Sequence, residues 1–298
     1  MSNLTVCDCL LAYKNARGTQ GSDSRFEALY LEFSYGTLAS KSRSFLTTLA
    51  QGWKRKDNSP ATINRKISLV KSAIKFCYES REGKDYERMI DHNYLEDFPL
   101  LPENNINYCI LNPEEKDAVY SELAPYLKPL FYQACYYPCR KEELLSLTKK
   151  QVDLSRKKIW IAEDKAKNGK GRLLPIPDEM MQWYSDRMRD LDTDYIFANG
   201  RKRIVDFKNA WNGALSRAAK KVGSDKILGY NWHKTRQQAA MELLYQGWDS
   251  MLIMHVGGWL TSSAFHRYVN VNDVLLDIKQ GLYTPDFSWK DRYPREFV

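Results

Sequence analysis

Apolar residues in the first third of the chain recur at the spacing of a helix. After residue 60 they fall three or four positions apart, as on one buried helical face. That face consists of Ile63, Ile67, Val70 and Ile74. Ser59 is a predicted N-cap and Pro60 the first helical residue, because a proline there gives up no helical hydrogen bond. The pattern therefore predicts a helical first third.

The pattern breaks near residue 100. The segment DFPLLPENNINYCILNPEE is rich in proline and asparagine, which is typical of a linker. It ends in a predicted helix start, with Asn112 as the cap and Pro113 in the first position. We therefore expect two domains, a helical N-terminal one over residues 1–105 and a C-terminal one over residues 112–298.

Two segments of the C-terminal domain have the composition of strands. KKIWIAE at 157–163 and GRLLPIP at 171–177 flank KNGK at 167–170. Asn-Gly between two such segments is a strong signal for a tight hairpin turn. The expected fold class is therefore mainly α, with a helical N-terminal domain and an α+β domain of helices and a small antiparallel sheet.

Helical spacing returns after residue 178. One predicted helix ends at Gly223, a common C-terminal stop. Its apolar stripe consists of Phe207, Trp211, Leu215 and Ala218. The next helix begins with HKTR and ends near Gln246, before Gly247. His233 and Arg236 share one face of it, and two cationic or donor groups repel each other unless an anion lies between them.

Composition excludes several classes of protein. Of the 298 residues, 43% are hydrophobic and 28% charged, which is globular composition, and the net charge of +8 favours a polyanionic partner. No stretch approaches 18 consecutive apolar residues, and the N-terminus lacks the layout of a signal peptide. The six cysteines have no CxxC spacing, so we expect reduced thiols in the cytoplasm and no metal site.

The predicted helix after Ser59 also has a basic side. Arg65, Lys71 and Lys75 fall away from the apolar stripe, and KRK at 54–56 precedes them. A solvated face is the commoner explanation of such charge. The alternative, which we predict here, is a helix that lies along a phosphate backbone.

Several residues of the C-terminal domain are ordinary when taken singly, but their order is not. From about residue 112 to 270 the series Arg…Lys…HxxR…Trp…Tyr resembles the tyrosine recombinase (phage integrase-like) family. LNPEEKDAVYSEL is similar to the opening of that family's catalytic domain, RKEELLSL to its first arginine motif and AKNGKGRLLPIP to its hairpin lysine segment. HKTR gives its HxxR, and NSPATINRKISLVKSAIKF resembles a helix of its core-binding domain.

GGWLTSSAFHRY resembles the family's final motif, in which the nucleophilic tyrosine follows a histidine or tryptophan by nine residues. Here the pair is Trp259 and Tyr268. Many members have LGH where this chain has GGW, and some members use tryptophan. Trp259 donates through its indole N–H and cannot shuttle a proton.

The resemblance implies a reaction that consumes neither metal nor nucleotide. Tyr268 would attack a DNA phosphodiester, leaving a 3′-phosphotyrosyl link and a free 5′-hydroxyl. Arg140 and Arg236 would hold the non-bridging oxygens, with further hydrogen bonds from His233 and Trp259. His233 would also accept the proton of the tyrosine.

The leaving 5′-oxygen needs a proton, which a hairpin lysine supplies in the family. Counting back from RLLP assigns that role to Lys167, with Lys165 and Lys170 as alternatives because hairpin register is easily miscounted. Glu143 is expected to orient Arg140 or His233 rather than to react.

The resemblance also implies a partner, double-stranded DNA, and a tetramer on two DNA sites. A C-terminal helix would dock on a neighbouring protomer, with packing in cis as the alternative. Its stripe would consist of Val274, Leu275, Ile278 and Leu282. The tail TPDFSWKDRYPREFV either wraps over a surface or is disordered. A type IB topoisomerase, a telomere resolvase and a DNA-binding protein without catalysis are the competing functions.

Overall fold

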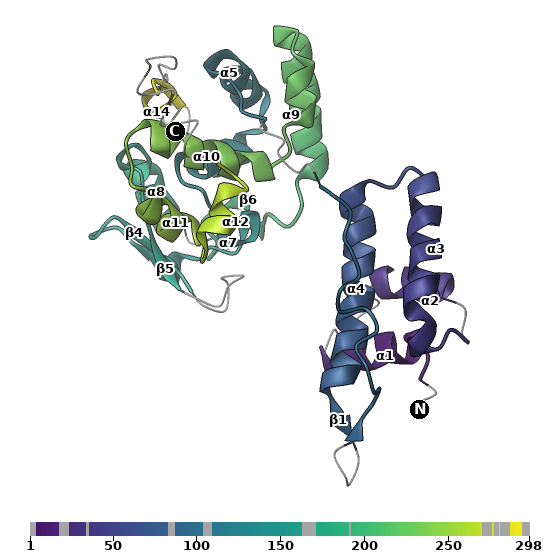
Figure 1. The fold of residues 1–298 in the computed structure, drawn as a ribbon. Coiled ribbons are helices and arrows are strands. Elements are labelled where there is room, and N and C mark those ends of the chain that lie inside the picture. The colour runs from purple at the N-terminus through teal and green to yellow at the C-terminus, as the bar shows by residue number, and fades with distance from the viewer. Residues whose placement is uncertain are drawn as a thin grey trace. The chain divides into compact units, whose positions relative to one another are not determined.

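Helices dominate the computed structural model of the chain, with small antiparallel sheets beside them (Figure 1). The described residues are 4–17, 24–33, 36–82, 87–103, 109–162, 171–190, 192–269, 276, 280 and 287–293. The chain divides into two compact units, Met1–Asn105 and Ile106–Val298. The predicted fold class, mainly α with a small antiparallel sheet in the second half, is confirmed.

The described part of the N-terminal unit contains four α-helices and one pair of antiparallel strands. They are α1 (Val6–Ala16), α2 (Ser24–Glu32), α3 (Ser42–Arg55), α4 (Pro60–Glu79), β1 (Arg81–Glu82) and β2 (Glu87–Arg88). α4 packs along α1 and α3. All four residues of its predicted apolar face are buried, and the Ser59 hydroxyl accepts a hydrogen bond from the Thr62 N–H at 3.3 Å. The predicted start and buried face of this helix are therefore confirmed.

Nine described helices belong to the C-terminal unit. They are α5 (Pro113–Glu122), α6 (Lys128–Tyr136), α7 (Lys141–Leu145), α8 (Met181–Arg189), α9 (Lys208–Val222), α10 (His233–Tyr245), α11 (Ser250–Gly257), α12 (Ser262–His266) and α14 (Trp289–Arg292). Asn112 and Glu115 form a capping box at the start of α5, and Gly223 ends α9 in the left-handed conformation. Both termini lie where the sequence predicted them.

The sheets of this unit are short and antiparallel. Their strands are β3 (Val152–Asp153), β4 (Lys158–Ile161), β5 (Arg172–Pro175), β6 (Ala198–Asn199) and β7 (Lys202–Arg203). The order β3-β4-β5 makes one sheet, in which Ile159 pairs with Leu174 and Trp160 with Leu173. The two predicted strands are therefore confirmed, whereas β3, β6 and β7 were not predicted. The Asn-Gly turn between β4 and β5 lies outside the described residues.

α10 lies at the centre of the C-terminal unit and packs against α6 and α11 (Figure 1). It is polar but largely buried, because its side chains bond to neighbouring elements. Gln238 donates to the Leu111 carbonyl at 3.0 Å, and Glu242 pairs with the buried Lys116 of α5. The helix ends at Tyr245, with Gly247 at φ +81°, as the sequence predicted.

The described part of the C-terminal tail packs on the core of its own unit. Trp289 is 2% exposed and stands edge-on to Tyr132 at 5.4 Å between ring centroids. Tyr293 stacks on Tyr120 at 3.7 Å, and Tyr132 donates to the Lys290 carbonyl at 2.7 Å. Of the two alternatives for this tail, residues 287–293 therefore follow the first. The four residues of the predicted docking stripe lie outside the described residues.

The six cysteines are all buried and free, in agreement with the expectation of reduced thiols. Within the ranges given above, no helix combines the length and the apolar character needed to cross a bilayer.

Candidate active site

Arg140 is held at the N-terminus of α7 by three hydrogen bonds. Its backbone N–H donates to Glu143 Oε2 at 3.0 Å, and its Nη1 donates to Glu143 Oε1 at 2.8 Å. Its Nη2 donates to the Gly258 carbonyl at 2.8 Å. The side chain remains 23% exposed, so the guanidinium is fixed in place and still accessible.

Glu143 is buried between two arginines. Its side chain is 1% exposed, and Arg172 of β5 binds it with both terminal nitrogens, at 3.0 Å and 2.6 Å. Burial alone would raise the pKa of Glu143, but hydrogen bonds and charge from Arg172 and then Arg140 hold that pKa below its usual range. Glu143 is therefore a carboxylate that orients Arg140, not a group that exchanges protons near neutral pH.

Arg236 is the second arginine of the site and is 2% exposed. Its Nη1 donates to the Pro138 carbonyl at 2.8 Å, and its Cζ lies 3.8 Å from the centroid of the Trp259 ring. Burial, together with the neighbouring Arg140 cation, lowers the pKa of Arg236 to about 10. The group therefore remains a cation at neutral pH, in a place that disfavours positive charge unless an anion joins it.

Tyr268, just after α12, faces the start of α10. Its hydroxyl shares a hydrogen bond of 2.8 Å with Nε2 of His233, the first residue of that helix. Its ring centroid lies 5.2 Å from that of Trp259, and Arg236 Cζ lies 5.6 Å from it. Gln237 donates to the Tyr268 carbonyl at 3.0 Å, so α10 holds the tyrosine by both side chain and backbone.

The two glycines before Trp259 are required by close packing. Gly258 ends α11 at φ +70°, and a Cβ there would lie 3.0 Å from the Arg172 guanidinium and 3.1 Å from Arg140 Nη1. A Cβ on Gly257 would lie 2.0 Å from the Trp259 ring. The GGW sequence therefore lets an indole and two guanidinium groups share a space that side chains at 257 and 258 would fill.

Two buried donors of this cluster have no hydrogen-bond partner among the described residues. They are Nε of Arg236 and Nε1 of Trp259. A buried donor left unsatisfied costs about 1–3 kcal/mol. Phosphate oxygens are acceptors of the kind that both donors lack, and the charge of a phosphate would balance that of Arg236. The cluster therefore has the chemistry of an anion site.

The structure brings together five of the six residues predicted as catalytic and the predicted supporting residue, Glu143. They are Arg140, Glu143, His233, Arg236, Trp259 and Tyr268. Lys167 and its alternatives Lys165 and Lys170 lie outside the described residues. Sequence reasoning missed Arg172, although the alternation of RLLPI places it on the same side of the strand as Leu174 and Ile176. A charged residue in such a position signals a buried partner.

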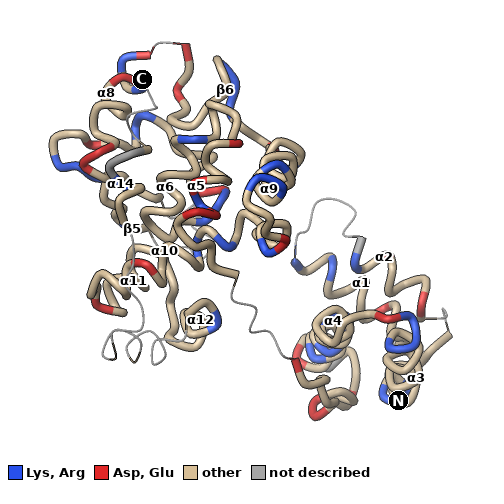
Figure 2. Tube along the Cα trace, turned by 90° about the horizontal axis from the view of Figure 1, so that it is seen from above, with Lys and Arg blue, Asp and Glu red and all other residues tan. Residues whose placement is uncertain are grey.

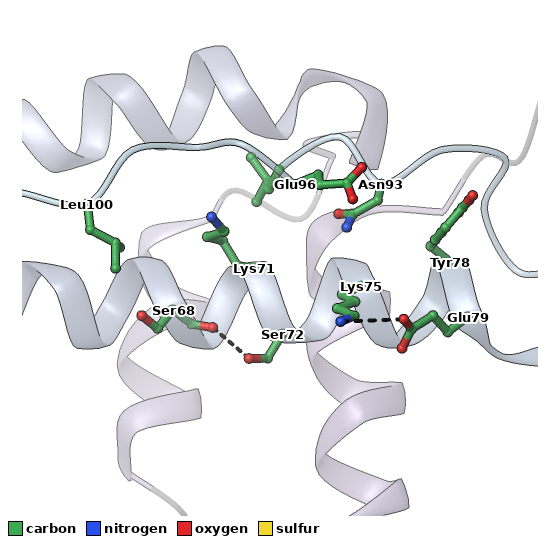
Figure 3. Close-up of a pocket in the computed structure, with 10 residues that line it drawn as sticks. Ser68, Lys71, Ser72, Lys75, Tyr78, Glu79, Asn93, Glu96 and Leu100 are labelled. Carbon is green, nitrogen blue, oxygen red and sulfur yellow. Dashed lines mark hydrogen bonds and ion pairs between the residues drawn. The ribbon is translucent and has the colours of Figure 1, made fainter. Parts of the chain in front are cut away.

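The basic residues predicted on α4 differ in their surroundings. Arg65 and Lys75 are exposed, and Lys75 pairs with Glu79 at 3.5 Å. Lys71 is instead half-buried and donates to the Phe98 carbonyl at 2.8 Å. Lys71 and Lys75 line a pocket of about 450 Å³ beside residues 93–100 (Figure 3). Figure 2 shows basic residues on α3 and α4 and, in the other unit, on α9.

Comparison with known proteins supports the assignment that these motifs suggested. The model of the phage integrase family matches residues 111–274. An integrase from Salmonella phage P22 is 22% identical over 233 residues, which are 74% of this chain and 56% of that integrase. The chain thus spans little more than half the length of the curated relative that it matches.

Solved structures of integrases share the fold. The Tn1549 transposon integrase in complex with a circular intermediate DNA superposes with a TM-score of 0.68 at 15% identity, over 94% of this chain and 100% of that one. A lambda integrase dimer bound to a COC′ core site gives 0.67 at 13% identity, over 89% and 95%. Because the family match covers more than half of the sequence and contains the assembled site, this chain belongs to the phage integrase family.

Proposed function

We propose that the protein is a site-specific DNA recombinase that cuts and rejoins duplex DNA through a 3′-phosphotyrosyl intermediate. One observation carries this proposal. The Tyr268 hydroxyl is hydrogen-bonded to His233, and its ring lies beside Arg236 and Trp259, each of which has a buried donor without a partner among the described residues. A nucleophile next to a base and a phosphate-binding pocket is the arrangement that transesterification requires.

In the proposed step the Tyr268 oxygen attacks the scissile phosphorus and the bond from phosphorus to the 5′-oxygen breaks. The phenol proton passes to Nε2 of His233, because a free tyrosine has a pKa of about 10 and forms little phenolate at neutral pH. The leaving 5′-oxygen takes a proton from a general acid, for which we propose Lys167. The new bond retains the phosphodiester energy, so the 5′-hydroxyl of a partner strand can reverse the step without a nucleotide cofactor.

The transition state carries more negative charge on the non-bridging oxygens than the substrate does. Arg140, Arg236 and Trp259 are donors that are already fixed before DNA binds. Preorganised donors of this kind stabilise developing charge without rearrangement at the moment of reaction. We propose that these three residues hold the phosphate and that Glu143 only positions Arg140.

The proposed partner is double-stranded DNA, gripped by phosphate contacts from both units. The net charge of +8 and the exposed cations of α4 support this. Related structures include an integrase dimer on a core site and a lambda integrase tetramer bound to a Holliday junction. We propose that this chain likewise assembles as a tetramer on two sites and acts in the cytoplasm, where its free thiols stay reduced.

The test is covalent capture of DNA. The protein is incubated with nicked duplexes that carry a randomised core, and DNA that stays attached after denaturation is recovered and sequenced. We expect a covalent adduct at a defined sequence, and no adduct with Tyr268→Phe. The matched control is Tyr126→Phe, which removes a hydroxyl from a half-buried tyrosine on the turn between α5 and α6.

Each outcome decides between functions. An adduct that persists in Tyr268→Phe would mean that another residue attacks the phosphate. Binding to a defined sequence without any adduct would favour a DNA-binding protein that does not cut. Relaxation of supercoiled DNA without exchange between two sites would favour a type IB topoisomerase.

A further inference from the structure

Arg172 is a buried cation that has no role in the reaction as proposed above. It opens β5 opposite Ile161 of β4, and its side chain is 3% exposed. Burying an arginine is unfavourable unless every part of its charge meets a partner. The contacts of the Arg172 guanidinium should therefore indicate the role of this residue.

Three nitrogens of Arg172 are bonded to two other elements. Nε donates to the carbonyl of Val256, near the end of α11, at 2.8 Å. Nη1 and Nη2 bind the Glu143 carboxylate of α7 as a fork. The same end of α11 presents the Gly258 carbonyl to Arg140. Arg172 and Arg140 are thus fixed on one carboxylate and one helix end.

The charges of this group explain what Arg172 contributes. Arg140 and Arg172 carry two positive charges and Glu143 carries one negative charge, so one positive charge remains for a phosphate. Without Arg172, Arg140 and Glu143 would form a neutral pair. The Glu143 carboxylate would then neutralise the charge of Arg140 and would draw the Arg140 guanidinium inward.

We infer that Arg172 is a positioning residue for the transesterification. It neutralises Glu143, so that the charge of Arg140 faces the scissile phosphate. This inference rests on the proposed function. The competing explanation is that Arg172 only ties β5 to α11 and stabilises the fold. Only the first explanation predicts that the effect of replacing Arg172 depends on the charge of the scissile phosphate.

The test compares cleavage rates at saturating DNA for the wild type, Arg172→Gln and Arg172→Lys. The substrate is the duplex recovered by covalent capture, with either a normal phosphate or a neutral methylphosphonate at the scissile position. We expect Arg172→Gln to slow cleavage of the normal duplex by about 10- to 100-fold, the usual effect of removing a group that orients an active-site residue. On the methylphosphonate duplex the defect should shrink to a few-fold.

A second variant tests the balance of charge directly. Arg172→Gln combined with Glu143→Gln removes one charge of each sign and leaves Arg140 with its full positive charge. We expect this double variant to cleave the normal duplex faster than Arg172→Gln alone. Arg172→Lys, which keeps the charge but not the fork, should fall between Arg172→Gln and the wild type.

Arg187→Gln is the matched control. Arg187 also binds a carboxylate, Asp190, and a backbone carbonyl, that of Ile196, at 2.7 Å and 3.1 Å. Its replacement should leave the cleavage of both duplexes unchanged.

Two results would overturn the inference while the wild type still forms its adduct. They are equal defects of Arg172→Gln on both duplexes, and a double variant that is no faster than the single one. A wild type that forms no adduct would instead overturn the proposed function itself. Thermal unfolding, followed in parallel, identifies a variant that is merely unfolded, and Arg172→Lys then takes its place in the comparison.

Discussion

The two units of the molecule differ in how deeply their most buried ion pairs lie. In the described part of the N-terminal unit the ion pairs range from exposed, as in Lys75–Glu79 at 60% and 59%, to half-buried, as in Lys66–Glu32 at 25% and 28%. The C-terminal unit also has exposed pairs, such as Arg189–Asp186 at 70% and 55%, but it adds two that are almost fully buried. Arg172–Glu143 is 3% and 1% exposed, and Lys116–Glu242 is 3% and 9% exposed. Both units have apolar cores, so the buried ion pairs of the C-terminal unit do not replace an apolar core.

Surface and buried charges suit different tasks on a polyanion. An exposed lysine is mobile and screened by salt, so it can meet any phosphate but fixes none. Burying a guanidinium costs desolvation free energy, and hydrogen bonds to its neighbours then fix its geometry. We therefore propose that the exposed cations of the N-terminal unit hold a DNA backbone, and that the buried arginines of the C-terminal unit act on one reacting phosphate.

The largest expected effect is on stability, from breaking a buried pair in the C-terminal unit. Lys116→Met leaves Glu242 buried without its cation and removes the Lys116 ammonium from the Trp289 ring, 4.2 Å away. We expect the free energy of unfolding to fall by about 3–5 kcal/mol. Lys75→Met, which breaks a surface pair, should cost no more than about 1 kcal/mol. Urea denaturation, followed by tryptophan fluorescence and circular dichroism, measures both changes.

The double variant Lys116→Met with Glu242→Gln sharpens this test. It removes both charges, so we expect it to recover part of the stability lost in Lys116→Met. Equal losses for Lys116→Met and Lys75→Met would mean that burial does not separate the two classes of ion pair, and the contrast between the units would fail.

The second largest effect is expected on the rate of DNA cleavage, when the planar cation of Arg236 is replaced. Arg236→Lys keeps the charge but loses the planar fork that donates to the Pro138 carbonyl and lies over Trp259. We expect the cleavage rate at saturating DNA to fall about 100- to 1,000-fold, the usual result of losing one preorganised donor. Arg65→Lys, at an exposed position of α4, should leave that rate unchanged.

Single-turnover formation of the covalent adduct measures this pair of variants, with DNA affinity followed separately by filter binding. A wild-type rate in Arg236→Lys would show that charge alone is needed at this position. The buried site would then resemble the surface cations, and preorganisation would not explain its burial.

Much of the fold follows from local patterns that need no tertiary information. Helix starts at Ser59 and Asn112 and the stop at Gly223 satisfy backbone groups within a few residues, so sequence alone indicates them. Strands of two residues, such as β6 and β7, carry too little pattern to be recognised. Their pairing depends on the surrounding chain.

The site was predictable to the extent that its motifs are linear. Arg140, His233, Arg236, Trp259 and Tyr268 stand in a characteristic order, but no linear pattern shows that Glu143 is shared with Arg172, 29 residues away. For a similar reason the sequence did not show that Lys71 is half-buried, whereas its predicted role on DNA stays a prediction. Its partner, the carbonyl of Phe98, comes from a loop whose path the sequence of α4 does not determine.

The smallest expected effect separates the lysines of α4 by their role on DNA. Lys75→Ala removes an exposed cation, so we expect DNA affinity to weaken modestly and the slope of log affinity against log salt to fall by about 1. Lys71→Ala should change that slope less, because its ammonium is engaged by the Phe98 carbonyl, and should destabilise the N-terminal unit more. Titrations at several salt concentrations, with thermal unfolding alongside, give both quantities. Equal salt slopes for the two variants would mean that Lys71 leaves its carbonyl to meet a phosphate, so that a half-buried cation of this unit rearranges on DNA.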